Sequence, residues 1–381
     1  MIYLDYNATT PLDPGVREAM LPFLGAVFGN PSSVHAAGRA ARGARAAGRA
    51  RAARVLGCKP SELVFTSGGT EANNLALHGA VLARLARGRH LVTCAVEHHA
   101  VLQPLDWLAR QYGCELTILP VDKDGRAAPE AGAAALRHDT ILVSIQAANN
   151  EIGTLQPVAE IGRLCRGRGL LFHTDAAQWF GKQPLMNVDM FSADLITICA
   201  HKFHGPKGAG LLYVRSPLQI PPLLRGGSHE NERRAGTENL AAIAGLTAAL
   251  ERFVKLPVFD PARLAPLTLR LRTALTAQPG VTLRSPTAGV LANTVAFTVA
   301  GTDSFALLAA LPFEGVCASS GSACASGALE PSHVIRALGV DAVEAGSLVR
   351  LSLGRENTDA ELDAATALLP RVIARCQAAP L

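Results

Sequence analysis

The segment DLITICAHKFHGPKGAGLLYVR, residues 194–215, holds two apolar runs joined by a turn rich in glycine and proline. Apolar runs of this length without polar alternation are typical of strands that are buried on both faces of a sheet. Five similar runs precede it, separated by helical stretches, and the expected strands are 62–67, 90–96, 115–120, 140–146, 170–176, 194–200 and 210–215. This alternation predicts an α/β fold with a mainly parallel seven-stranded sheet. Ligands of such a sheet bind at the carboxyl ends of its strands.

The chain changes character near residue 256, where prolines begin to punctuate it. Beyond this point the runs 293–299 and 347–353 are typical of strands in a second, smaller sheet. We therefore expect a large domain over residues 13–256. Residues 1–12 and 257–381 are expected to form a small α+β domain.

Composition limits the class of protein. Of the 381 residues, 49% are hydrophobic and 18% are charged, a globular balance that supplies more than one core. No apolar run reaches the roughly 18 residues of a membrane helix, and the N-terminal MIYLDYNATTPLDP lacks the pattern of a signal peptide. We therefore expect a cytoplasmic protein without membrane contact. The eight cysteines are scattered and form no CxxC pair, so neither a disulfide framework nor a metal site is expected.

A run of arginines among alanines is the most visible concentration of positive charge in a chain of net charge +5. The run comprises Arg39, Arg42, Arg45, Arg49, Arg51 and Arg54, and the spacing of the first four places them on one side of a helix. Such a face is usually solvated, and the alternative is a docking surface for an acidic protein or an RNA. The stretch has no aromatic residue for base stacking, so direct nucleic-acid binding is not expected.

Two polar residues follow predicted strands of the large sheet. Lys202 lies in CAHKFHGPKGAG (199–210), where its amine could form a Schiff base with an aldehyde cofactor. A lysine beside a glycine turn is otherwise usually solvated. Asp175 lies in HTDAAQ (173–178), where burial would require a cationic partner such as a protonated pyridine nitrogen. The alternative role of Asp175 is to cap the following helix.

Two further strand ends carry candidate cofactor contacts. In FTSGGTEANN (65–74), Gly69 and Thr70 open a helix whose N-terminus suits a phosphate, although these residues could simply start the helix. In VEHHAV (96–101), a histidine could stack on a heteroaromatic ring and transfer protons. Spacing alone does not choose between His98 and His99. A metal site is the rival interpretation, but further ligands at suitable spacing are lacking.

The C-terminal part contributes a thiol and a cation. Cys324 lies among small residues in CASSGSACASGALEPS (317–332), a composition that suits a mobile loop able to carry a thiolate. An arbitrary cysteine is usually inert. Arg350 lies in the apolar run of VRLSLGRENT (349–358), where it would pair either with a substrate carboxylate or in an internal salt bridge.

Eleven ordered segments together resemble the cysteine desulfurase family, within the class V aminotransferase group of fold-type I pyridoxal-phosphate (PLP) enzymes. The segments are YLDYNATTP, FGNPSS, FTSGGTEANN, EHHAV, NNEIGTLQP, TDAAQ, HKFHGPKG, AGTEN, SSGSAC, LEPSHVIRALG and RLSLGR. The resemblance implies a fold-type I PLP-dependent transferase that converts L-cysteine to L-alanine and passes sulfur to an enzyme cysteine as a persulfide. The SSGSAC form of the cysteine loop resembles the housekeeping and nitrogen-fixation subgroup.

The resemblance also implies a role for each matching residue. Lys202 is similar to the Schiff-base lysine, Cys324 to the persulfide-forming nucleophile and His98 to the ring-stacking histidine. Asp175 is similar to the pyridinium partner, and Arg350 is similar to the arginine that binds the substrate carboxylate. Asn150 and Gln178 resemble residues near the phenolic oxygen and the substrate. The residues that resemble phosphate contacts are Gly69, Thr70 and His201. Thr237 resembles a residue that reaches the phosphate of the neighbouring subunit, which implies a homodimer.

The chain departs from the family pattern at two positions. Cys199 stands where the family usually has a serine that donates to the phosphate, and a thiol is a weaker donor, so weaker PLP retention is expected. Arg225 replaces the first residue of the usual glycine triplet.

Several alternative functions and acceptors remain open. Competing functions are an aminotransferase, a selenocysteine lyase or an inactive docking subunit, and Cys324 favours the desulfurase over the aminotransferase. The sulfur acceptor is expected to be an iron–sulfur scaffold or a tRNA-thiolation enzyme.

Overall fold

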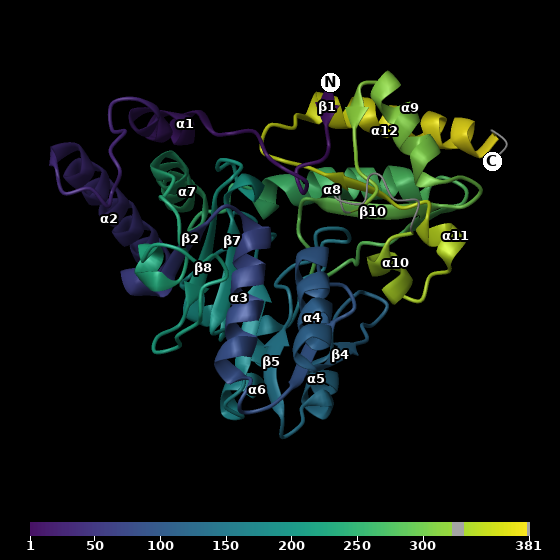
Figure 1. The fold of residues 1–381 in the computed structure, drawn as a ribbon. Coiled ribbons are helices and arrows are strands. Elements are labelled where there is room, and N and C mark those ends of the chain that lie inside the picture. Colours follow the sequence, from purple (N-terminus) through teal and green to yellow (C-terminus); the bar gives the residue numbers. More distant parts are fainter. Residues whose placement is uncertain (322–330, 379–381) are drawn as a thin grey trace.

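The computed structural model describes residues 1–321 and 331–378, and it contains sheets of seven, three and two strands, with helices around them (Figure 1). The larger sheet has seven strands in the order β2-β8-β7-β6-β5-β3-β4. The strands are β2 (Leu63–Thr66), β3 (His90–Cys94), β4 (Glu115–Leu119), β5 (Thr140–Ser144), β6 (Leu171–Asp175), β7 (Leu195–Cys199) and β8 (Gly210–Val214). Strand β8 pairs antiparallel with both neighbours, and the other pairings are parallel. The predicted α/β class, the seven strands and their mainly parallel arrangement are confirmed.

Helices cover both faces of the larger sheet because its central strands are apolar on both sides. Leu195 and Leu142 belong to the core beneath α3 (Gly69–Arg84) and α4 (His99–Tyr112), whereas Ile196 and Val143 belong to the core on the other face. That second core also takes residues from α1, α2, α6 and α7. These helices are α1 (Pro14–Met20), α2 (Ala36–Leu56), α6 (Val158–Gly167) and α7 (Leu240–Phe253), and α5 (Pro129–Ala135) lies near the β4 edge.

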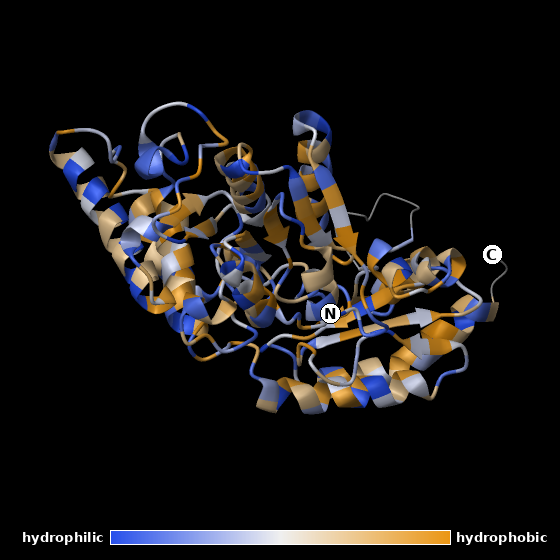
Figure 2. Ribbon diagram, turned by 90° about the horizontal axis from the view of Figure 1, so that it is seen from below, coloured by the Kyte–Doolittle hydropathy of each residue, from blue (hydrophilic) through white to orange (hydrophobic). Residues whose placement is uncertain are grey.

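The smaller sheet is antiparallel, with the order β12-β10-β9. Its strands are β9 (Val281–Leu283), β10 (Thr294–Val299) and β12 (Val349–Ser352), so both strands expected beyond residue 256 are confirmed. Helices α8 (Pro261–Thr276), α9 (Ser304–Phe313) and α12 (Asp359–Ala378) pack around it, as Figure 1 shows. Figure 2 views the molecule from below and shows strongly hydrophobic strands enclosed by helices that carry both polar and apolar residues.

The N-terminal segment packs against the smaller sheet rather than the larger one, and its strand belongs to a separate two-stranded sheet. Strand β1 (Ile2–Tyr3) pairs in parallel with β11 (Val316–Cys317), and Leu4 and Tyr6 lie in the core that includes β10 and β12. In contrast, the short helices α10 (His333–Ala337) and α11 (Ala342–Ala345) contribute Val334, Ile335 and Ala345 to the core of the larger sheet. The division into domains at residues 12 and 256 stays a prediction.

The arginine run forms helix α2 as expected, but its side chains have partners inside the chain. Arg45 pairs with Glu238, Arg49 with Glu230 and Arg51 with Glu251. The expectation of a simply solvated face is therefore wrong for Arg45 and Arg49, because the loop before α7 supplies buried carboxylates to them, whereas Arg51 is exposed and pairs with Glu251 of α7 at the surface. No helix in the described part of the chain is long and apolar enough to cross a membrane.

Candidate active site

The polar candidates converge at the carboxyl edge of the larger sheet. Asp175 is the last residue of β6, and Lys202 lies in a short 3-10 turn (Ala200–Lys202) directly after β7. His98 follows β3 as the residue that caps α4. Because β3, β6 and β7 run in the same direction, their ends deliver these three side chains to one edge.

Lys202 points inward and not to solvent. Its Nζ donates hydrogen bonds to the backbone carbonyls of Asn7 at 2.9 Å and Ala8 at 2.8 Å. Burial is the main cause of a lowered pKa for this amine, with nearby Arg350 adding to the effect and Cys199 and Asp175 opposing it. A lowered pKa favours the neutral amine, which is the form that reacts with an aldehyde.

Asp175 is a buried carboxylate whose two oxygens are both held in place. Asn73 Nδ2 donates to Oδ2 at 2.6 Å, and the backbone N–H of Ala177 donates to Oδ1 at 2.9 Å. The Ala177 contact belongs to a local turn, and no α-helix begins there. The alternative prediction that Asp175 caps a helix is therefore wrong. Among the described residues Asp175 forms no ion pair, which leaves it suited to a cationic ligand.

The structure distinguishes the two adjacent histidines. His98 Nδ1 accepts a hydrogen bond from the backbone N–H of Ala100 at 3.0 Å, so the neutral ring carries its proton on Nε2. Burial lowers the pKa of His98, with Asp175 opposing and Lys202 reinforcing this shift. The ring of His99 lies instead against the ring of His333, with centroids 4.6 Å apart.

The expected phosphate contacts cluster around the start of α3. Gly68, the residue before this helix, has no side chain with which to cap it. The backbone of Gly69 hydrogen-bonds to the thiol of Cys199, and Thr70 is exposed beside it. His201 Nδ1 lies 3.1 Å from Thr9 Oγ1, and burial lowers the pKa of His201 to about 4.

Arg350 is buried, and its guanidinium group makes two contacts within the chain. Its NH2 pairs with Asp5 Oδ1 at 2.7 Å, and its NH1 donates to the Asn150 carbonyl at 2.9 Å. The internal salt bridge that the sequence left open is therefore present. The Nε atom of Arg350 is buried without a hydrogen-bond partner in the described part of the chain.

Sequence reasoning gave no role to Asn7, although its segment YLDYNATTP was part of the family resemblance. The Asn7 carbonyl accepts from Gln178 Nε2 at 2.9 Å as well as from Lys202. Its side chain bonds to Thr294 Oγ1 at 2.9 Å and to Lys182 Nζ at 2.5 Å. Asn7 thus links the larger sheet's edge to the smaller sheet.

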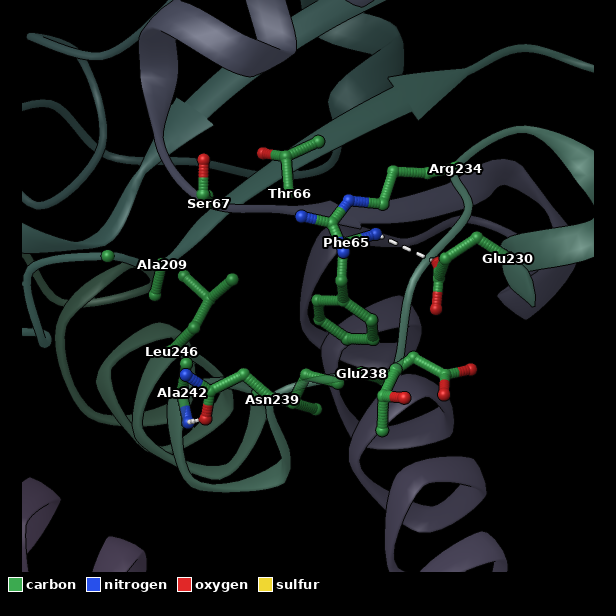
Figure 3. Close-up of a pocket in the computed structure, with 14 residues that line it drawn as sticks. Phe65, Thr66, Ser67, Ala209, Glu230, Arg234, Glu238, Asn239, Ala242 and Leu246 are labelled. Carbon is green, nitrogen blue, oxygen red and sulfur yellow. Dashed lines mark hydrogen bonds between the residues drawn. The ribbon is translucent and has the colours of Figure 1, made fainter. Parts of the chain in front are cut away.

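Thr237 lies apart from Lys202, on the outer side of the sheet edge. It lines a cavity of about 160 Å³ between the ends of β2 and β8 and the start of α7, shown in Figure 3. Ser67 and Arg234 line the same cavity, and Glu230 accepts a hydrogen bond from the Phe65 N–H at 2.9 Å. Thr237 itself is exposed.

Cys324 lies outside the described residues, but the described chain on both sides of it is fixed at the site. Before it, Ser319 forms a bridge with Arg350, with an Arg350 N–H to Ser319 carbonyl distance of 2.6 Å. After it, Ser332 Oγ donates to Glu151, and His333 Nε2 lies 2.8 Å from the Glu97 carbonyl. Both flanks therefore end at the site.

A Schiff-base lysine candidate, a held carboxylate and an uncapped helix start on a mainly parallel sheet are the features of a PLP-binding class of protein. Comparison with known proteins agrees: a sequence profile of the aminotransferase class-V family matches residues 2–365, so the chain belongs to this family. Within it, the chain is a member of the cysteine desulfurases. The cysteine desulfurase IscS of Dictyoglomus turgidum is 45% identical, over 98% of this chain and 94% of that protein.

Solved structures show the same relationship. A NifS-like protein superposes with a TM-score of 0.91 at 34% identity, covering 98% of this chain and 99% of that one. The structure of SspA in complex with cysteine superposes with a TM-score of 0.82 at 34% identity, covering 94% of this chain and 100% of that one.

Enzymes of this family depend on PLP, and the residues present fit that cofactor. The amine of Lys202 suits the aldehyde, and the carboxylate of Asp175 suits the pyridinium nitrogen. The imidazole of His98 suits the ring face, and the uncapped start of α3 suits the phosphate.

Proposed function

We propose that this chain is a PLP-dependent cysteine desulfurase that converts L-cysteine to L-alanine and takes the sulfur on Cys324. The observation that carries the proposal is the convergence of Lys202, Asp175 and His98 at one sheet edge, in a member of the cysteine desulfurases. When bound, PLP supplies an aldehyde and a ring that withdraws electrons from the α-carbon of the amino acid.

The chain's own groups provide the remaining chemistry. Asp175, oriented by Asn73, keeps a cationic ring nitrogen protonated. Lys202, with its lowered pKa, can take a proton from the substrate α-carbon and return it. His98 presents its Nε2–H to the site because the Ala100 N–H occupies its Nδ1.

Sulfur transfer requires the thiolate of Cys324. The thiolate attacks the substrate sulfur, forming an S–S bond while the carbon–sulfur bond breaks, and that bond's electron pair remains with the carbon fragment, which is protonated to alanine. The contacts of Ser319 with Arg350 and of Ser332 with Glu151 support this role, since both residues are close in sequence to Cys324.

Arg350 and Asn150 are proposed to bind the substrate carboxylate. Arg350 Nε is a buried donor without a partner in the described chain, and the side-chain amide of Asn150 makes no hydrogen bond with the described residues. The substrate carboxylate and Asp5 would then both interact with the guanidinium group of Arg350. The two carboxylates would compete for this one cation.

A homodimer is proposed on two grounds. Thr237 is exposed and lines a cavity apart from Lys202, which fits a residue that serves the site of a neighbouring subunit. The segment before α2 exposes Leu24, Phe28 and Val34, apolar side chains that a second copy could cover. The cytoplasmic location and transfer of sulfur to an iron–sulfur scaffold or a tRNA-thiolation enzyme are likewise proposals.

The test is to incubate the PLP-loaded protein with L-cysteine and dithiothreitol and to quantify alanine and sulfide together. We expect equal amounts of both products, and loss of both in Cys324→Ala but not in the matched control Cys317→Ala. Products that persist in Cys324→Ala would move the sulfur chemistry to another thiol. Bound PLP without alanine would favour an aminotransferase.

A further inference from the structure

A second lysine of the site is buried without an assigned role. Lys182 lies in the turn after β6 and is only 2% exposed. Burying an ammonium group is costly unless it is paired. Yet in the described part of the chain Lys182 forms no ion pair, so its retention in the interior calls for another explanation.

Two amide oxygens and one aromatic ring surround the amine. Lys182 Nζ donates to Asn7 Oδ1 at 2.5 Å and to Gln178 Oε1, and it lies 5.1 Å from the centroid of the Phe259 ring. Burial lowers the pKa of Lys182 well below its usual value, and Lys202 and Arg350 lower it further while Asp5 opposes them. A neutral amine still has two N–H groups, which matches the two acceptor oxygens.

This arrangement helps to determine which way both amides face, and Asn293 Nδ2, which donates to Asn7 Oδ1 at 3.0 Å, assists at Asn7. An amide group presents an oxygen on one side and an NH2 group on the other, and a donor such as Lys182 selects the oxygen. Gln178 must then turn its Nε2 toward the Asn7 carbonyl, 2.9 Å away. Asn7 must turn its Nδ2 toward Thr294 Oγ1, 2.9 Å away, and the Asn150 carbonyl, 3.2 Å away.

The oriented amides lie next to the reactive lysine. The Asn7 carbonyl that receives Gln178 Nε2 also receives Lys202 Nζ, so Lys182 and Lys202 contact the same asparagine from two sides. We propose that Lys182 is a positioning residue, which fixes the amides of Gln178 and Asn7 and thereby sets the hydrogen-bonding environment of Lys202 and its cofactor. This inference rests on the proposed PLP chemistry and adds to it a residue that does not react.

The test uses the visible absorption of PLP bound to Lys202, titrated with pH, rather than activity. In Lys182→Met the Gln178 amide keeps its Nε2 bond to the Asn7 carbonyl but loses the donor to its Oε1, so its orientation is held by one hydrogen bond instead of two. We expect the apparent pKa of the absorption band to rise by about 0.7 unit, the shift produced when one ordinary hydrogen bond to one protonation state is lost. The exposed Lys123→Met serves as the matched control and should leave the titration unchanged.

A double-mutant cycle separates positioning from mere stability. If Lys182 acts through Gln178, the shift in Lys182→Met/Gln178→Leu should equal that of Gln178→Leu alone. Lys182→Gln keeps an NH2 donor, so its apparent pKa should lie between those of the wild type and Lys182→Met. This variant also provides a measurement if Lys182→Met does not fold. A wild-type titration curve in Lys182→Met would overturn the proposal, and so would a wild-type curve in Lys182→Gln/Gln178→Leu. Shifts of the two single variants that add up in Lys182→Met/Gln178→Leu would also overturn it. Wild-type protein that shows the band but makes no alanine would instead refute the desulfurase activity alone.

Discussion

Lys202 Nζ donates a 2.9 Å hydrogen bond to the carbonyl of Asn7, a residue 195 positions earlier in the chain. The contact makes the N-terminal segment a wall of the site, although Leu4 and Tyr6 of that segment lie in the core of the smaller sheet. The same segment supplies Asp5, the partner of Arg350. Changes in residues 5–8 should therefore affect the reacting lysine and the proposed carboxylate site together.

Replacement of Arg350 by lysine tests the carboxylate site. Lysine keeps the charge but cannot make the forked contact, so Arg350→Lys should raise the KM for L-cysteine about 10- to 100-fold, as expected for one charge-assisted hydrogen bond of ~1.5–3 kcal/mol. Steady-state kinetics with the exposed Arg336→Lys as control checks this. An unchanged KM would assign Arg350 to the Asp5 pair only.

Asp175→Asn should weaken electron withdrawal by the cofactor ring. A neutral amide cannot keep the ring nitrogen protonated, so kcat should fall on the order of a hundredfold, a magnitude typical of a lost electrostatic partner. The control is Asp106→Asn, a substitution of an exposed residue that pairs with Arg110. A loss confined to KM would contradict the assigned role.

Cys199→Ser tests the departure from the family pattern. The thiol is a weak donor, and the backbone of Gly69 already contacts it at the start of α3. A hydroxyl should tighten PLP binding about fivefold, the gain expected from one hydrogen bond of ~1 kcal/mol. Equilibrium dialysis against free PLP measures the affinity, with Cys58→Ser as control. If the serine variant retains PLP no better than wild type, the weakness lies elsewhere.

Glu97 makes stability depend on pH in a predictable direction. Burial is the main cause that raises its pKa to about 8, and Asp175 adds to the shift while the Gln146 N–H opposes it. Between the unfolded value near 4.5 and about 8, the folded chain therefore holds a proton that the unfolded chain releases. Its contribution to stability is complete at low pH and declines as pH rises through this window, by at most ~1.4 kcal/mol per unit.

The comparison variant for this pH dependence is Glu97→Gln, which cannot ionise. Thermal unfolding of both proteins between pH 5 and 8 should show a steeper loss of Tm for the wild type. Parallel curves would show that Glu97 does not change its protonation on unfolding.

The sequence predicted the larger sheet well because each strand is a short apolar run without alternation. The same criterion missed β9, since Val281–Leu283 has only three residues and its middle residue is exposed. Lys202 and Asp175 could be picked out because each lies at or just after the end of a strand, and parallel strand ends meet, whereas the choice of His98 over His99 came from the family resemblance.

Other parts of the site depend on distant contacts that no local pattern shows. Lys182 follows β6 by several residues and resembles any surface lysine in sequence, yet Asn7 meets it across 175 positions. For Arg350, the sequence left the choice between substrate and salt bridge open, because the bridge to Asp5 spans 345 positions.

These long spans have a consequence for how the molecule is made. During synthesis Asp5 and Asn7 leave the ribosome about 345 residues before their partners Arg350 and Ser352. The larger sheet, complete by residue 214, can form while translation continues. The pocket for the cofactor closes only when β12 has emerged and the N-terminal residues dock beside it, so we expect newly made chains to acquire PLP only after β12 has left the ribosome.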